Sequence, residues 1–126
     1  MKKISIILSF LLISLVSCEE KATNVQVVSY EEMETYLDLE DIQLVDVRTP
    51  KEYKEGHINQ AQNIDFFSPT FDQDIQKLDK DKPVMVYCQM GGRSAKCAEK
   101  MKELGFVKIY DFKGGYSKWK SQEQTK

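Results

Sequence analysis

The sequence predicts one α/β domain in which helices cover a mostly parallel sheet. Its 126 residues match the usual size of a single domain and leave little chain for a second one. Five short apolar runs alternate with stretches that carry helix start signals or helical spacing of apolar residues. This alternation is typical of parallel strands joined by crossover helices.

Each of the five apolar runs has the length and composition of a strand buried in a parallel sheet. The runs lie at residues 25–29, 42–47, 62–66, 83–88 and 107–112. We therefore expect a mostly parallel five-stranded sheet flanked by helices.

Two helices are predicted from their capping boxes. Ser29 is followed three residues later by Glu32, and Thr49 by Glu52. Pro50 stands at the first position of the second helix, where a missing N–H costs nothing. Both helices should therefore begin directly after these hydroxyl residues.

A third helix is expected to begin near Ser94 and to be terminated by Gly105, since glycine commonly follows the last turn of a helix. Its spacing predicts one apolar face. That face should contain Ala95, Cys97, Ala98, Met101 and Leu104.

The N-terminus has the three-part layout of a secretory signal. Lys2 and Lys3 precede an apolar run, 4–16, that ends at Ser17 and Cys18. The stretch "LVSC" resembles the lipobox of bacterial lipoproteins, in which the chain is cut before a cysteine that then carries a lipid. An ordinary cleaved signal is the alternative. We expect an exported bacterial lipoprotein, periplasmic or in the cell envelope, held at a membrane through the lipid on Cys18.

The chain then divides into four segments. Residues 1–17 are interpreted as a lipoprotein signal peptide, 18–26 as the lipidated cysteine and a linker, 27–121 as the folded domain and 122–126 as a polar tail.

The chain has 18 basic and 20 acidic residues, and residues 1–17 contribute two lysines and no acid. This acidic balance argues against nucleic-acid binding. We expect a monomer.

Cys88 stands where the strand at 83–88 ends, and ligands of open α/β sheets bind beyond that edge. Three interpretations compete: a nucleophile, half of a disulfide, or a small apolar residue. The following loop can turn its N–H groups inward. The positive end of the helix that begins near Ser94 and the charge of Arg93 also favour a thiolate at Cys88. The residues expected to bind substrate are Gln89, Met90, Gly91, Gly92, Arg93 and Ser94.

Several motifs, in order, resemble the rhodanese family of sulfurtransferases: "LVDVRTPKEYKEGHI", "DKPVMVYCQMGGRSAKCAEKMKELGF" and "KGGYSKWK". The resemblance implies a single rhodanese-like domain over 27–121. It also implies that Cys88 takes a sulfane sulfur from a donor, thiosulfate or a persulfide, as a Cys88 persulfide. A thiol or cyanide would then accept the sulfur. No cofactor and no metal are expected.

Two alternatives to sulfur transfer stay open at this point. The first is a cysteine phosphatase or arsenate reductase of related fold, since the same loop could hold a phosphate. Those relatives carry C-x5-R, whereas Cys88 and Arg93 form C-x4-R, and the shorter loop favours sulfur. The second alternative is a rhodanese-like binding module without catalysis.

Asp46 and Arg48 end the second predicted strand on the same edge as Cys88. They are expected to pair with each other or to brace the loop, rather than to contact substrate. His57, the only histidine, is interpreted as structural. Cys97 is interpreted as a small buried residue, with a resolving cysteine as the lesser alternative. By the resemblance, turn and packing roles are expected for Gly114, Gly115 and Trp119.

The sequence also departs from the family pattern. Asn59 and Gln60 stand where a proline and a glycine are frequent. Gln89 and Met90 are neutral, whereas rhodaneses that prefer thiosulfate often carry a cation there. A persulfide or polysulfide donor is therefore expected to serve better than thiosulfate.

Overall fold

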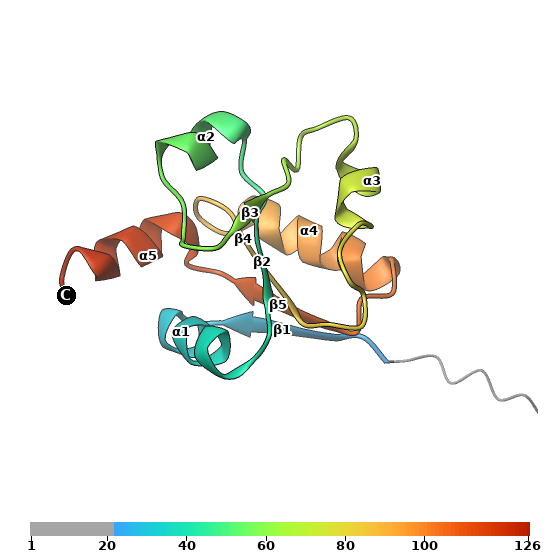
Figure 1. Ribbon diagram of the computed structural model, residues 1–126, viewed down its shortest axis with the longest axis horizontal. Coiled ribbons are helices and arrows are strands. Elements are labelled where there is room, and N and C mark those ends of the chain that lie inside the picture. Colours follow the sequence, from blue (N-terminus) through green and yellow to red (C-terminus); the bar gives the residue numbers. More distant parts are fainter. Residues whose placement is uncertain (1–21) are drawn as a thin grey trace, which may run out of the picture.

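Five parallel strands form one sheet in the order β1-β5-β4-β2-β3 (Figure 1). A computed structural model describes residues 22–126, so the expected signal peptide and Cys18 lie outside the described residues. The strands are β1 (Asn24–Val28), β2 (Gln43–Asp46), β3 (Gln62–Asn63), β4 (Val84–Tyr87) and β5 (Lys108–Phe112). All five expected strands and their parallel arrangement are confirmed, which confirms the α/β fold class.

Five helices connect or follow the strands in the described part of the chain. They are α1 (Tyr30–Leu39), α2 (Pro50–Glu55), α3 (Phe71–Ile75), α4 (Gly92–Glu103) and α5 (Gly115–Glu123).

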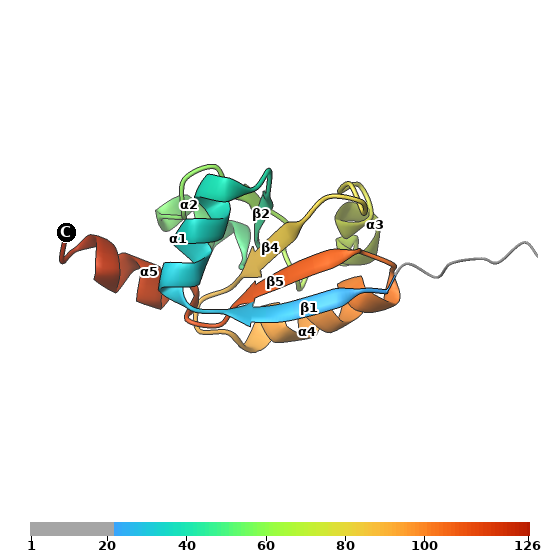
Figure 2. The ribbon, with the colours of Figure 1, turned by 90° about the horizontal axis from the view of Figure 1, so that it is seen from below.

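The sheet separates two apolar clusters because successive residues of a strand point to opposite faces. In β4, Val84 and Val86 pack with α3 and α4, whereas Met85 and Tyr87 pack with α1 and α5. In Figure 2, α1 and α4 lie on opposite sides of the sheet. All four residues of β4 are buried, as expected for a strand covered on both faces.

Both expected capping boxes are confirmed. The hydroxyl of Ser29 accepts from the backbone N–H of Glu32, and Thr49 stands in the same relation to Glu52. Pro50 occupies the first position of α2. The two helices therefore begin where hydroxyl oxygens satisfy N–H groups that would otherwise lack a partner.

Helix α4 differs from expectation at two positions. It begins at Gly92 rather than near Ser94, which brings the helix start closer to Cys88. Ala95 was expected on the apolar face but is exposed, because the buried stripe passes through Ser94, Cys97 and Met101 instead. A polar residue thus faces the core at the first turn, a point that apolar spacing cannot predict.

The folded region is wider than the expected limits of 27 and 121. Strand β1 begins at Asn24, and α5 continues to Glu123. Neither α3 nor α5 was predicted as a helix, since neither has a capping box and α5 begins with glycine. Within residues 22–126, no helix combines the length and apolar character needed to cross a membrane.

Candidate active site

Strand β4 is an interior strand, paired with β2 on one side and β5 on the other, and it delivers Cys88 to the edge of the sheet. Cys88 is the first residue after the strand and is only 1% exposed. It is a free thiol in the described part of the chain. The position of the sulfur is therefore set by an interior strand that is paired on both sides.

The loop after Cys88 turns its N–H groups toward the sulfur. The N–H of Gly91 donates to Cys88 Sγ over 3.0 Å, and the φ of Gly91 is +109°. Burial by itself would raise the pKa of Cys88. The N–H groups of Ser94, Gly91 and Met90, together with the Ser94 hydroxyl, outweigh burial, so the pKa of Cys88 lies below its usual value.

The first turn of helix α5 donates hydrogen bonds to backbone carbonyl groups of the same loop. The N–H of Tyr116 donates to Cys88 O over 2.8 Å, and that of Ser117 donates to Gln89 O over 3.1 Å. Gly115 makes this approach feasible: its φ is +63°, and a Cβ there would lie 2.5 Å from Cys88 O. The second glycine of the final motif thus allows the close contact with the cysteine loop.

Arg48 and Asp46 form a buried ion pair beside the loop. Their side chains are 2% and 0% exposed, and Arg48 Nη2 lies 2.7 Å from Asp46 Oδ2. Arg48 Nη1 also donates to Gln89 Oε1 over 3.0 Å, and Nη2 donates to Gly56 O over 2.6 Å. The guanidinium lies 4.1 Å from the centre of the Tyr116 ring. This network ties β2, the cysteine loop and α5 together.

Arg93 points to Glu52 rather than into the ring of N–H groups. Its Nη1 and Nη2 donate to the two Glu52 oxygens over 2.8 and 3.0 Å, the bidentate geometry of a strong pair. The bond to Arg93, with smaller contributions from the backbone and hydroxyl of Thr49, lowers the pKa of Glu52 to about 2. The sequence indicates only the helix-cap role of Glu52, and nothing in its spacing indicates the pair with Arg93.

Ser94 and Asp111 lie beneath the loop on the α4 side. Ser94 Oγ is 3.7 Å from Cys88 Sγ and 3.2 Å from Gly91 O. Asp111, in β5, is 5% exposed, and its Oδ1 has no hydrogen-bond partner among the described residues. Sequence reasoning missed Asp111, because an acid within an apolar strand gives no indication of what it faces.

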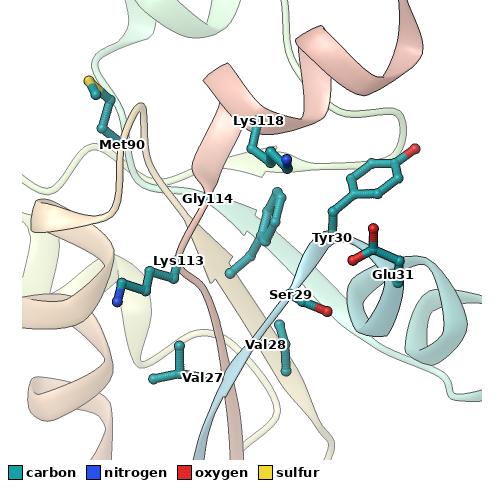
Figure 3. Close-up of a pocket in the computed structure, with 10 residues that line it drawn as sticks. Val27, Val28, Ser29, Tyr30, Glu31, Met90, Lys113, Gly114 and Lys118 are labelled. Atoms are coloured by element: carbon teal, nitrogen blue, oxygen red, sulfur yellow. The ribbon is translucent and has the colours of Figure 1, made fainter. Parts of the chain in front are cut away.

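Met90 is 78% exposed. It borders a cavity of about 550 Å³ between the loop, the turn after β5 and the start of α1. Figure 3 shows Met90 and Lys113 on one side of this cavity and Tyr30 and Glu31 on the other. Cys88 is not among the residues that line it.

His57 and Cys97 do not take part in the cysteine loop, because the first contacts Tyr53 and the second is buried in the core. The His57 ring stacks on Tyr53 with centroids 3.7 Å apart, and its Nδ1 is 2.8 Å from Tyr53 O. Cys97 is fully buried, and burial raises its pKa to about 12. A thiol with such a pKa is protonated at neutral pH and is a poor nucleophile.

The remaining positions singled out in the sequence lie outside the loop. Trp119 stacks on Tyr116, with ring centroids 5.7 Å apart, within the α1 and α5 cluster. Gln60 has a φ of 68°, so it adopts the left-handed conformation that a glycine would take there. In the described residues, no group of His, Cys, Asp and Glu is arranged to hold a metal ion.

Comparison with known proteins identifies relatives over most of the chain. The rhodanese-like domain matches residues 29–122. The uncharacterized protein YqhL of Bacillus subtilis (strain 168) is 39% identical over 84 residues, 67% of this chain and 65% of YqhL. Thiosulfate sulfurtransferase GlpE of Coxiella burnetii (strain RSA 331 / Henzerling II) is 36% identical over 85 residues, 68% of this chain and 78% of GlpE.

Solved structures give the same result. Reduced CoADR-RHD of Bacillus anthracis superimposes with a TM-score of 0.70 at 26% identity, covering 80% of this chain. The match spans only 17% of CoADR-RHD and less than two thirds of YqhL, so both relatives contain sequence that this chain does not match.

Proposed function

The chain belongs to the family of rhodanese-like domains, and from this premise we propose that it is a sulfurtransferase that carries sulfur on Cys88. The observation that most supports the proposal is the Gly91 N–H, which donates to Cys88 Sγ over 3.0 Å. A ring of N–H groups that lowers the pKa of Cys88 favours the thiolate that must attack sulfur.

The reaction has two steps. The Cys88 thiolate attacks the outer sulfur of a donor; a new S–S bond forms, the donor's bond to that sulfur breaks, and its electron pair leaves with the donor fragment. An acceptor thiolate then attacks the outer sulfur of the Cys88 persulfide and releases the Cys88 thiolate. The persulfide is an anion as well, so the same N–H groups stabilise the resting form and the intermediate.

We propose a persulfide or polysulfide as the preferred donor. Thiosulfate carries a sulfonate that would benefit from an unpaired cation, but in the described loop Arg93 is occupied by Glu52 in two hydrogen bonds. Gln89 and Met90 add no charge. Turnover should therefore be faster with glutathione persulfide than with thiosulfate, and a large advantage for thiosulfate would contradict this choice.

Mass spectrometry after incubation with a donor tests the transfer itself. We expect one added sulfur atom on Cys88, its removal by an acceptor thiol, and no addition in Cys88→Ser. Cys97→Ser is the matched control and should load normally. A wild-type protein left unchanged by every donor would favour the binding-module alternative. Hydrolysis of an aryl phosphate, assayed in parallel, would favour the phosphatase alternative.

We further propose that the protein is an exported lipoprotein attached to a membrane through Cys18. The proposal depends on residues 1–18 of the sequence. In a bacterial host, the full chain should incorporate labelled fatty acid and sediment with membranes, and Cys18→Ala should do neither. Equal labelling of the two forms would contradict it.

A further inference from the structure

The side-chain amide of Gln89 is held by the protein at both of its polar atoms. Its Oε1 accepts from Arg48 Nη1 over 3.0 Å, and its Nε2 donates to the Ser117 hydroxyl over 2.9 Å. A polar residue directly after Cys88 is expected to face substrate, yet this amide already has partners from the segment after β2 and from α5. Its role therefore needs an explanation other than contact with substrate.

The backbone of Gln89 is tied to the same helix as its side chain. The carbonyl of Gln89 accepts from the N–H of Ser117 over 3.1 Å, so the two residues exchange one backbone bond and one side-chain bond. The preceding carbonyl, that of Cys88, accepts from the N–H of Tyr116 over 2.8 Å. Two successive carbonyl groups of the cysteine loop therefore point to the first turn of α5.

The direction of these carbonyl groups sets the direction of the N–H groups that follow them. In a trans peptide the C=O and the N–H point to opposite sides, and the described residues contain no cis peptide bond. Because the Gln89 carbonyl points to α5, the N–H of Met90 points away from α5. The next N–H, that of Gly91, donates to Cys88 Sγ over 3.0 Å. Both N–H groups offset the effect of burial on the pKa of Cys88.

We propose that Gln89 is a positioning residue, whose anchored amide holds the loop so that the next two N–H groups face the sulfur of Cys88. Its partner Arg48 is fixed by the buried ion pair with Asp46, and its other partner lies in α5, so the amide is anchored to two separate parts of the fold. Such anchoring restricts the backbone that carries the side chain. The inference rests on the thiolate of the proposed function, and its tests therefore measure protonation rather than turnover.

The first test uses Ser117→Ala, which removes the bond to Gln89 Nε2 but no group that contacts the sulfur. The pKa of Cys88, measured from thiolate absorbance, should rise by about half a unit, because poorly directed N–H groups stabilise the thiolate less. Ser117→Thr keeps the hydroxyl and should restore the wild-type value. Ser121→Ala is the matched control, since its hydroxyl donates within α5, to Lys118 O over 2.9 Å. An unchanged pKa in Ser117→Ala, or an equal rise in the control, would contradict the proposal.

The second test uses Gln89→Met, which keeps the length of the side chain and loses both of its hydrogen bonds. The pKa of Cys88 should rise by about one unit, more than in Ser117→Ala. Adding Ser117→Ala to Gln89→Met should raise it no further, because the hydroxyl acts through the amide. Lower stability in denaturant without a change in this pKa would show a merely structural role and would refute the proposal. If Gln89→Met does not fold, the two Ser117 variants decide.

The two proposals can fail separately. If the pKa of Cys88 rises in these variants but the wild-type protein does not load sulfur, the sulfurtransferase proposal fails and the positioning role of Gln89 stands. If Cys88 loads sulfur while the variants keep the wild-type pKa, the reverse holds.

Discussion

The cysteine loop is supported on both faces of the sheet, and the two supports differ in how completely their polar groups are paired. On the α2 and α5 face, the buried Arg48 donates to Asp46, Gln89 and Gly56. On the α4 face, one oxygen of Asp111 has no partner among the described residues. The paired side fixes the position of the loop through a hydrogen-bonded ion pair, whereas the other side leaves a buried carboxyl oxygen without a partner.

The largest expected effect comes from breaking the paired side with Arg48→Met. The substitution leaves the carboxylate of Asp46 buried without its cation, which should cost about 3–5 kcal/mol of unfolding free energy. Denaturant unfolding measures the loss. Lys77→Met, which removes an exposed pair with Asp74 at 2.9 Å, is the control and should cost far less. Similar losses in the two variants would show that the buried pair contributes nothing special.

Gly115→Ala tests the close approach of α5 to the loop. A Cβ at Gly115 would meet Cys88 O at 2.5 Å, and the φ of +63° disfavours other residues. We expect a loss of roughly 2 kcal/mol in unfolding free energy and slower sulfur loading, because the loop must shift. At Gly92, a Cβ has no neighbour within 4 Å, so Gly92→Ala should unfold like wild type. A stable Gly115→Ala protein that loads at the normal rate would contradict this account.

Glu52→Gln removes a charge from the paired side but keeps a capping side chain. The half-buried pair with Arg93 should contribute about 1 kcal/mol above pH 5, since partial exposure limits its strength. The folded-state pKa of Glu52 is about 2, below the ordinary value of a free glutamate. Its contribution is therefore present above that ordinary value and is lost as pH falls toward 2. The two proteins should converge in stability at low pH, and a constant difference would oppose this explanation.

Cys97→Ala should have the smallest effect and sharpens the description of the α4 face. Removing one buried sulfur atom should cost about 1 kcal/mol or less of unfolding free energy. Sulfur loading on Cys88 and its discharge should be unchanged, because burial keeps the Cys97 thiol protonated. A persulfide that persists longer in the variant would instead identify Cys97 as a resolving cysteine.

The elements that position the site follow from local rules and could be predicted. The apolar runs around Val45 and Val86 predict buried strands, and the pair of Ser29 with Glu32 predicts a helix start. Cys88 was identified from its place after a strand and before a glycine turn. These features depend on residues close together in the chain, where sequence spacing and spatial arrangement coincide.

The partners of the loop could not be predicted, because they come from distant parts of the chain. Glu52 and Arg93 are 41 residues apart, as are Arg48 and Gln89. Asp111 lies opposite Val86 only because β5 pairs with β4. Arg93 was expected to contribute its charge to the cysteine, and its pairing with Glu52 became visible only in the fold.

Cys88 is only 1% exposed, so the reactive sulfur is harder to approach in the free thiolate than in the persulfide. A persulfide places its terminal atom about 2 Å beyond the cysteine sulfur, since that is the length of an S–S bond. In the proposed cycle, a donor needs a narrow end to reach the buried thiolate, whereas an acceptor attacks a sulfur atom about 2 Å farther from the cysteine. The width of the donor molecule should therefore limit sulfur loading onto Cys88, whereas the acceptor molecule can be wider.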